Sequence, residues 1–249
     1  MSGLSAIYRR EMLSLWVTPL AWVLLVVFLL LEGAIFYSIV VHFTTLPDIA
    51  ADVGPVQLFF GQESVLLPLT LVLICPALTM RTFAEERRSG TIETLLTAPV
   101  TPFAVVLGKY LATLSTYVLI WAPTLLYVVI LRKTGSIDWQ VVGTSYLGVF
   151  GVGATYLAIG NLMSAMTKSQ LIALLLTVLF VFGMFVMGIG EYVFEDGLFH
   201  DLCAHVSMAA QMEDFSKGIV DLRRVVFDGS VIALSLFFTT RVVDSWRWD

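Results

Sequence analysis

The sequence predicts an all-α membrane protein with six transmembrane helices, and its composition and apolar blocks carry that prediction. Of its 249 residues, 58% are hydrophobic and only 13% are charged, and the mean hydropathy is +0.90. A soluble domain this apolar would lack the polar surface needed to cover its core. The apolar residues gather in blocks of about 20, enough for a helix to cross about 30 Å of hydrocarbon. Because these blocks are continuous and do not alternate with polar residues, they favour helices over barrel strands.

The first element expected is an amphipathic helix over residues 3–16, lying at the membrane surface ahead of the first span. Its apolar residues recur at three- and four-residue spacing, with Arg9, Arg10 and Glu11 between them. A cleavable signal peptide would have a shorter apolar core and a small-residue cleavage site, which this segment lacks.

Six spans follow, and we expect them to form a single membrane domain over residues 1–249. Pro123 is expected to kink the third span. An amphipathic connector over residues 191–228 is expected on the outer side, dipping into the outer leaflet before a short last span. The spans are expected at residues 19–41, 63–80, 103–131, 141–166, 171–189 and 229–243.

Basic residues predict the orientation, because cytoplasmic loops carry an excess of Lys and Arg. With both termini in the cytoplasm, nine of the 14 basic residues lie on the inner side. These nine are Arg9, Arg10, Arg81, Arg87, Arg88, Lys109, Lys168, Arg241 and Arg247. The pattern indicates a multi-pass protein with cytoplasmic termini, and the bacterial inner membrane is the expected location. The net charge of −5 excludes a strongly basic nucleic-acid binder.

The charged connector over residues 81–102 is the most informative segment. Residues 81–88 can extend the second span into the cytoplasm as a helix, and Ser89-Gly90 breaks it. Thr91 can cap a new short helix whose apolar side carries Ile92, Leu95 and Leu96. An exposed amphipathic helix of this kind needs a partner, which could be lipid, another face of the protein or a soluble subunit.

Residues 83–101, followed by Leu107, Gly108 and Lys109, resemble the signature of type-2 ABC-transporter permeases. The similarity is greatest to the branch associated with bacterial gliding motility and copper-enzyme maturation, and residues 205–221 also resemble that branch. The resemblance implies a permease without its own ATPase. It implies cytoplasmic ABC ATPase subunits as partners, a second permease subunit, identical or not, and a possible periplasmic partner.

The resemblance also implies that residues 90–96 form a coupling helix that docks on the ATPase. Apolar side chains would supply the buried contact and charged ones the orientation. The expected coupling residues are Glu85, Arg87, Arg88, Gly90, Thr91, Ile92, Glu93, Leu95 and Leu96. The chain carries no Walker motif, so ATP and Mg²⁺ are expected on the partner ATPase. No catalytic residue, metal site or bound cofactor is expected on this chain.

Two alternatives stay open. The connector could lie on lipid, or the chain could be a non-transporting scaffold that anchors cytoplasmic and periplasmic partners. Glu32, inside the first span, is either a pathway-lining or proton-sensitive acid, or a group near the outer interface that is protonated or bonded to a neighbouring helix. The sequence does not decide between export of a substrate and transmission of force across the membrane.

Overall fold

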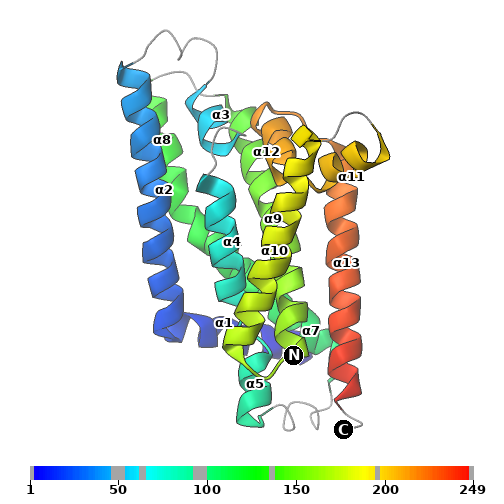
Figure 1. Cartoon of the computed structure of the whole chain (residues 1–249). Coiled ribbons are helices and arrows are strands. Elements are labelled where there is room, and N and C mark those ends of the chain that lie inside the picture. The colour runs from blue at the N-terminus through cyan, green and yellow to red at the C-terminus, as the bar shows by residue number, and fades with distance from the viewer. Residues whose placement is uncertain are drawn as a thin grey trace.

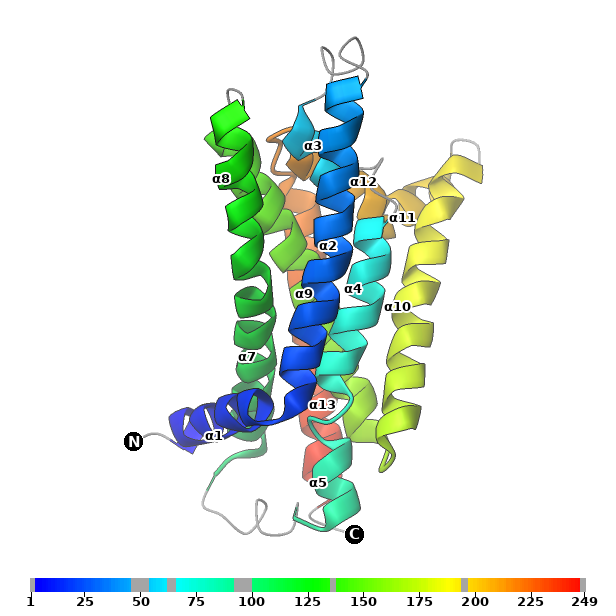
Figure 2. The same cartoon turned by 90° about the vertical axis from the view of Figure 1, so that its left-hand side faces the viewer.

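The computed structural model describes residues 3–45, 54–61, 66–91, 100–134, 138–193 and 197–246. Six helical segments within these residues are long and apolar enough to cross a membrane, and the described ranges contain no strand. The predicted all-α fold with six membrane-spanning helices is therefore confirmed. The long helices stand side by side, and α1 and α5 lie at one end of the bundle with the end of α13 (Figures 1 and 2). We call this the α5 end and the opposite one the α12 end.

The chain begins with α1 (Gly3–Val17), which runs across the α5 end of the bundle, and continues into α2 (Pro19–Thr45), the first span (Figure 2). On α1, Ile7 is buried and Arg9 and Arg10 are exposed, as expected of an amphipathic surface helix, and the apolar Leu13 and Val17 are exposed as well. The predicted N-terminal helix is therefore present. The short helix α3 (Pro55–Phe60) packs between α2, α9 and α12 at the α12 end.

The second span differs from its prediction. It covers residues 67–89 instead of 63–80, and its helix is interrupted between α4 (Leu66–Thr79) and α5 (Ala84–Ser89). The extension expected over residues 81–88 is therefore part of this span, but a turn over residues 80–83 interrupts the helix, and Ser164, on another helix, satisfies the backbone there. Its hydroxyl accepts hydrogen bonds from the amides of Phe83 (3.1 Å) and Ala84 (3.2 Å) and donates one to the carbonyl of Met80 (3.2 Å).

The third span consists of α7 (Pro102–Trp121), the 3₁₀ turn η2 (Ala122–Thr124) and α8 (Leu125–Thr134). Thr101 caps α7 by accepting a hydrogen bond from the amide of Ala104. At Pro123, where a kink was expected, the 3₁₀ turn interrupts the α-helix, because proline cannot donate the helical hydrogen bond at that position.

The fourth span, α9 (Trp139–Met166), is the central helix of the bundle, with contacts to α4, α7, α10 (Gln170–Val193), α12 and α13. Glycines allow these close approaches. A Cβ atom at Gly153 would overlap the Tyr117 ring of α7, and one at Gly160 would overlap the Thr79 side chain of α4. Gly153 and Gly160 therefore serve helix packing.

The segment before the last span forms α11 (Leu198–Val206) and α12 (Met208–Ser216), and the last span is α13 (Leu222–Ser245). The connector was expected to dip into lipid, but α12 packs on α9. There Phe215 is buried against Gly148, and the Thr144 hydroxyl donates to the Phe215 carbonyl at 2.8 Å. The last span also begins seven residues earlier than expected, because Asp221 caps the helix through the amide of Arg223.

Replacing Gly153 with alanine should destabilise the protein by about 1–3 kcal/mol, because the added methyl group collides with the packed Tyr117 ring. Gly183→Ala on α10 is a matched control, since no described atom lies within 4 Å of the position its Cβ would take. Thermal unfolding of the purified variants measures both effects. Equal unfolding temperatures for the two variants would contradict the close α7–α9 contact.

Candidate functional site

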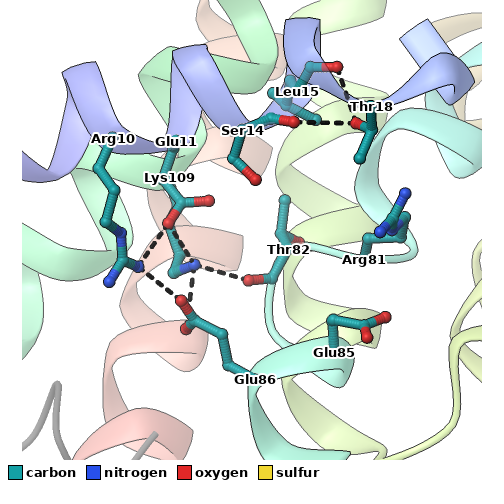
Figure 3. Close-up of a pocket in the computed structure, with 10 residues that line it drawn as sticks. All are labelled: Arg10, Glu11, Ser14, Leu15, Thr18, Arg81, Thr82, Glu85, Glu86 and Lys109. Atoms are coloured by element: carbon teal, nitrogen blue, oxygen red, sulfur yellow. Dashed lines mark hydrogen bonds and ion pairs between the residues drawn. The ribbon is translucent and has the colours of Figure 1, made fainter. Parts of the chain in front are cut away.

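A buried lysine joins three helices at the α5 end of the bundle. Lys109, in the second turn of α7, is only 1% exposed. Its Nζ atom lies 3.0 Å from Glu11 Oε1 of α1 and 3.1 Å from Glu86 Oε2 of α5, and it donates to the Thr82 carbonyl at 2.8 Å (Figure 3). The lysine charge is thereby shared between two carboxylates that come from different helices.

Arg10 closes the network on the solvent side. Its Nη2 atom lies 2.6 Å from Glu11 Oε1 and 2.6 Å from Glu86 Oε1 (Figure 3). Two carboxylates and two cations therefore form a group with no net charge. We call Arg10, Glu11, Glu86 and Lys109 the charged junction.

Local sequence explains why these side chains meet. A Cβ atom at Gly108 would lie 3.0 Å from Ile7, so the glycine allows α1 to cross closely over α7. Glu11 follows Ile7 by one helical turn and so faces α7 as well, next to Lys109. The Tyr8 hydroxyl adds a hydrogen bond to Ser115 of α7 at 3.0 Å. Glu86 reaches the junction from the first turn of α5, where the helix dipole also stabilises a carboxylate.

Burial makes the pairing at the junction necessary, since an isolated buried charge costs several kcal/mol. Burial alone would raise the pKa of the Glu11 carboxyl. The charges and hydrogen bonds of Lys109 and Arg10 outweigh that effect and hold this pKa below its usual value of 4.5. Glu11 is therefore a carboxylate at neutral pH.

A polar cavity of about 210 Å³ lies beside the junction, between α1, α7 and the break in the second span (Figure 3). Arg81 and Glu85 line it together with the junction residues. One oxygen of Glu85, Oε2, is buried there without a hydrogen-bond partner among the described residues. Glu85 was predicted as a coupling residue, and the structure places it next to the junction.

The other predicted coupling residues divide into two groups. Arg87 is held on the bundle, because its Nη1 atom donates to the Ala165 carbonyl at 3.0 Å and its guanidinium lies 4.7 Å from the Trp246 ring centroid. Arg88, Gly90 and Thr91 are exposed at the end of α5.

Gly90 ends α5 with a φ of 72°, a left-handed conformation that favours glycine, so the predicted helix break is confirmed. Four predicted coupling residues lie outside the described residues, namely Ile92, Glu93, Leu95 and Leu96.

Glu32 is fully buried within α2, with the Thr70 hydroxyl of α4 near enough to interact. It does not line the junction cavity. The burial of Glu32 against a neighbouring span fits both interpretations, so its role stays a prediction.

Sequence reasoning missed the junction itself. Lys109 was considered only as a basic residue of the inner side and as part of a motif, and Glu11 and Glu86 were not singled out. The available signal was the pair Gly108-Lys109 near the start of a span. The glycine indicates that another helix can pass close by, and the lysine indicates a charge that needs anionic partners if that contact buries it. No group of three possible metal ligands occurs in the part of the chain that the structure describes.

The comparisons with known proteins bear on the same region. A family model described as "ABC-2 family transporter protein" matches residues 41–199, which is well over half of the chain. The match includes Glu86, Lys109 and the whole of α9, whereas Arg10 and Glu11 precede it. No curated protein matches the chain.

Lys109→Met should lower the unfolding free energy by about 2–4 kcal/mol, because it removes the buried cation and leaves two partly buried carboxylates with Arg10 alone. Arg10→Gln should cost about 1 kcal/mol or less, since the Arg10 side chain is 52% exposed. Adding Glu86→Gln to Lys109→Met should restore part of the loss. Unfolding curves of the purified variants give these values, and similar losses for the two single variants would refute the central role of Lys109.

The junction also predicts a pH dependence. Because the pKa of Glu11 is lowered on folding, its contribution to stability is complete above the usual value of 4.5 and is lost as the pH falls through the lowered pKa. The difference in unfolding temperature between wild type and Glu11→Gln should therefore stay constant down to about pH 4.5 and shrink only below it. A difference that already shrinks near neutral pH would mean that the carboxyl is not held by these cations.

Proposed function

The chain belongs to the ABC-2 family of transporter proteins, and from this premise we propose that it is the permease subunit of an ATP-driven transporter whose ATPase is a separate polypeptide. The observation that carries the proposal is the charged junction. It joins α5, from which the expected coupling segment emerges, to the surface helix α1 and the third span α7.

The attachment of α5 makes it suited to transmit movement. Glu86 binds it to α1 and α7, while Arg87 and the break capped by Ser164 bind it to α9. The stacking of Arg87 on Trp246 adds the end of α13. A displacement applied at the exposed end of α5 would therefore reach four other helices through directional contacts instead of being absorbed in a loose loop.

In this proposal residues 90–96 form the coupling helix. Ile92, Leu95 and Leu96 would fill an apolar groove of the ATPase, and Arg88 and Glu93 would orient the helix at its rim. Closure of the ATPase around ATP and Mg²⁺ would then push the coupling helix toward the membrane. The chain itself contributes no catalytic group and binds no cofactor.

The rest of the assembly follows from the same reasoning. The α5 end would face the cytoplasm of a bacterial inner membrane, in agreement with the basic residues of that end. A second permease subunit, identical or not, would complete the transporter, and α2 and α10 offer it long faces of exposed apolar side chains. The resemblance to the gliding-motility and copper-enzyme-maturation branch adds a possible periplasmic partner, and with it force transmission as an alternative to export.

A scaffold without transport is the second candidate function, and it would use the same exposed segment to recruit soluble proteins. The two candidates differ in one measurable property. A permease changes the turnover of its bound ATPase, whereas a scaffold binds its partners without changing their activity.

Ile92→Asp and Leu95→Asp should each abolish co-purification of the ATPase and any effect of the chain on its ATP hydrolysis, because a carboxylate cannot enter an apolar groove without a partner. Thr94→Asp is the matched control, since it adds the same charge on the polar side of the predicted helix and should retain binding. Pull-down and ATP hydrolysis in nanodiscs measure both outcomes. Retention of the ATPase by the two apolar-face variants would remove the coupling-helix proposal, and an unchanged ATPase turnover with and without the chain would favour the scaffold.

A further inference from the structure

A buried carboxylate near the α12 end has no place in the function proposed above. Because α13 begins at Leu222, Asp228 lies inside the last span, about 9 Å along the helix axis from its start. Its side chain is only 8% exposed. An acid at this depth is costly, and in membrane proteins such residues commonly mark a binding site or a pathway.

The surroundings of Asp228 provide hydrogen bonds but no cation in direct contact, and the charge of Arg224 acts on the carboxylate only from beyond salt-bridge distance. Gln211 of α12 donates to Asp228 Oδ2 at 2.7 Å, and the Thr155 hydroxyl of α9 also interacts with the carboxyl. Arg224 lies one turn earlier on α13, but its Nε atom is 3.1 Å from Asp214 Oδ2 and its Nη1 atom donates to the Ala204 carbonyl. Among the described side chains, no Lys or Arg nitrogen lies within 4.0 Å of the Asp228 carboxylate.

Asp228 lines a groove of about 660 Å³ between α9, α12 and α13. The other lining side chains are mostly apolar, and the groove opens at the surface of the bundle, where Leu147 is 50% and Val225 39% exposed. Gly143 and Gly229 keep the walls open, since no described atom lies within 4 Å of a Cβ built at either position. An apolar groove of this volume with one or two fixed polar groups has the features of a small-molecule site.

We propose that this groove binds a lipophilic amine, with the apolar body of the ligand between α9 and α13 and its ammonium group against Asp228. Charge complementarity selects this ligand class, because the groove offers a carboxylate and an apolar wall but no available cation. A zwitterionic phospholipid fits less well, since its phosphate would find Arg224 already paired with Asp214. An apolar helix of a second copy would cover the walls but would leave Asp228 without a positive partner.

The test is equilibrium binding of radiolabelled dodecylamine to the purified full chain in phosphatidylcholine nanodiscs, corrected for empty nanodiscs. We expect saturable binding that dodecanol, the neutral analogue, does not compete at the same concentration. Asp228→Asn keeps the shape and the hydrogen bond to Gln211 and should raise the Kd at least about tenfold, the scale of one hydrogen bond to a charged group.

Two glycine variants test the position of the ligand in the groove without changing the carboxylate. Gly229→Leu fills the groove from α13 and should also raise the Kd at least about tenfold, whereas Gly183→Leu, the matched control on α10, should leave it unchanged. Both positions accept the side chain without a described atom within 4 Å of the Cβ. All variants must keep the wild-type unfolding temperature, and if Gly229→Leu does not, Gly143→Leu replaces it.

Several outcomes would overturn the proposal. Equal affinities for dodecylamine and dodecanol would show that the Asp228 carboxylate does not contribute to ligand binding. An unchanged Kd for Asp228→Asn would show the same. Competition by phosphatidylethanolamine at equal concentration would identify a lipid site. Loss of self-association in Gly229→Leu, with amine binding intact, would identify an interface between copies. The assay contains no ATPase, so its result is independent of whether the proposed coupling to ATP hydrolysis is correct.

Discussion

The α5 end of this protein depends on one electrostatic requirement, which is that the buried Lys109 charge must have anionic partners. No residue of its own helix supplies them. Glu11 arrives from a helix lying across the bundle and Glu86 from the helix that leaves it, so neutralising one lysine fixes the positions of α1, α5 and α7 together. The short, directed contacts of these ion pairs add to the packing of Ile7 on Gly108 and favour one arrangement of the helices.

The central helix α9 supplies the second constraint. Its glycines allow α4 and α7 to pack closely against it. In its last turn, Ser164 accepts a hydrogen bond from the backbone of the second span, and the Ala165 carbonyl accepts one from Arg87. At its other end it forms one wall of the groove that contains Asp228. One helix thus connects the region expected to receive force with the region proposed to bind a ligand, through a densely packed interior that transmits displacement.

Much of the fold could be predicted from the sequence, because apolar blocks, Pro123 and Gly90 act through local physics. The errors have non-local causes. The break before α5 could not be foreseen because Ser164, which satisfies it, lies some 80 residues further along the chain. The early start of α13 was missed because Arg224 and Asp228 look too polar for a span until Asp214 and Gln211 are placed beside them. Of the candidate site, the sequence indicated Glu85 to Thr91 but not the partners that anchor them, and Asp228 was assigned to a connector.

The order of the junction residues along the chain has a consequence for how the protein enters the membrane during synthesis. Arg10, Glu11 and Glu86 all precede Lys109, so both carboxylates have already left the ribosome when the lysine-bearing helix reaches the translocon. The lysine can therefore enter the membrane interface as part of a neutral group, and not as an unpaired cation. Ser164 and Ala165 emerge later, so α5 acquires its final anchorage only once the fourth span is in place. During synthesis the charges would thus be paired first, and α5 would be fixed last.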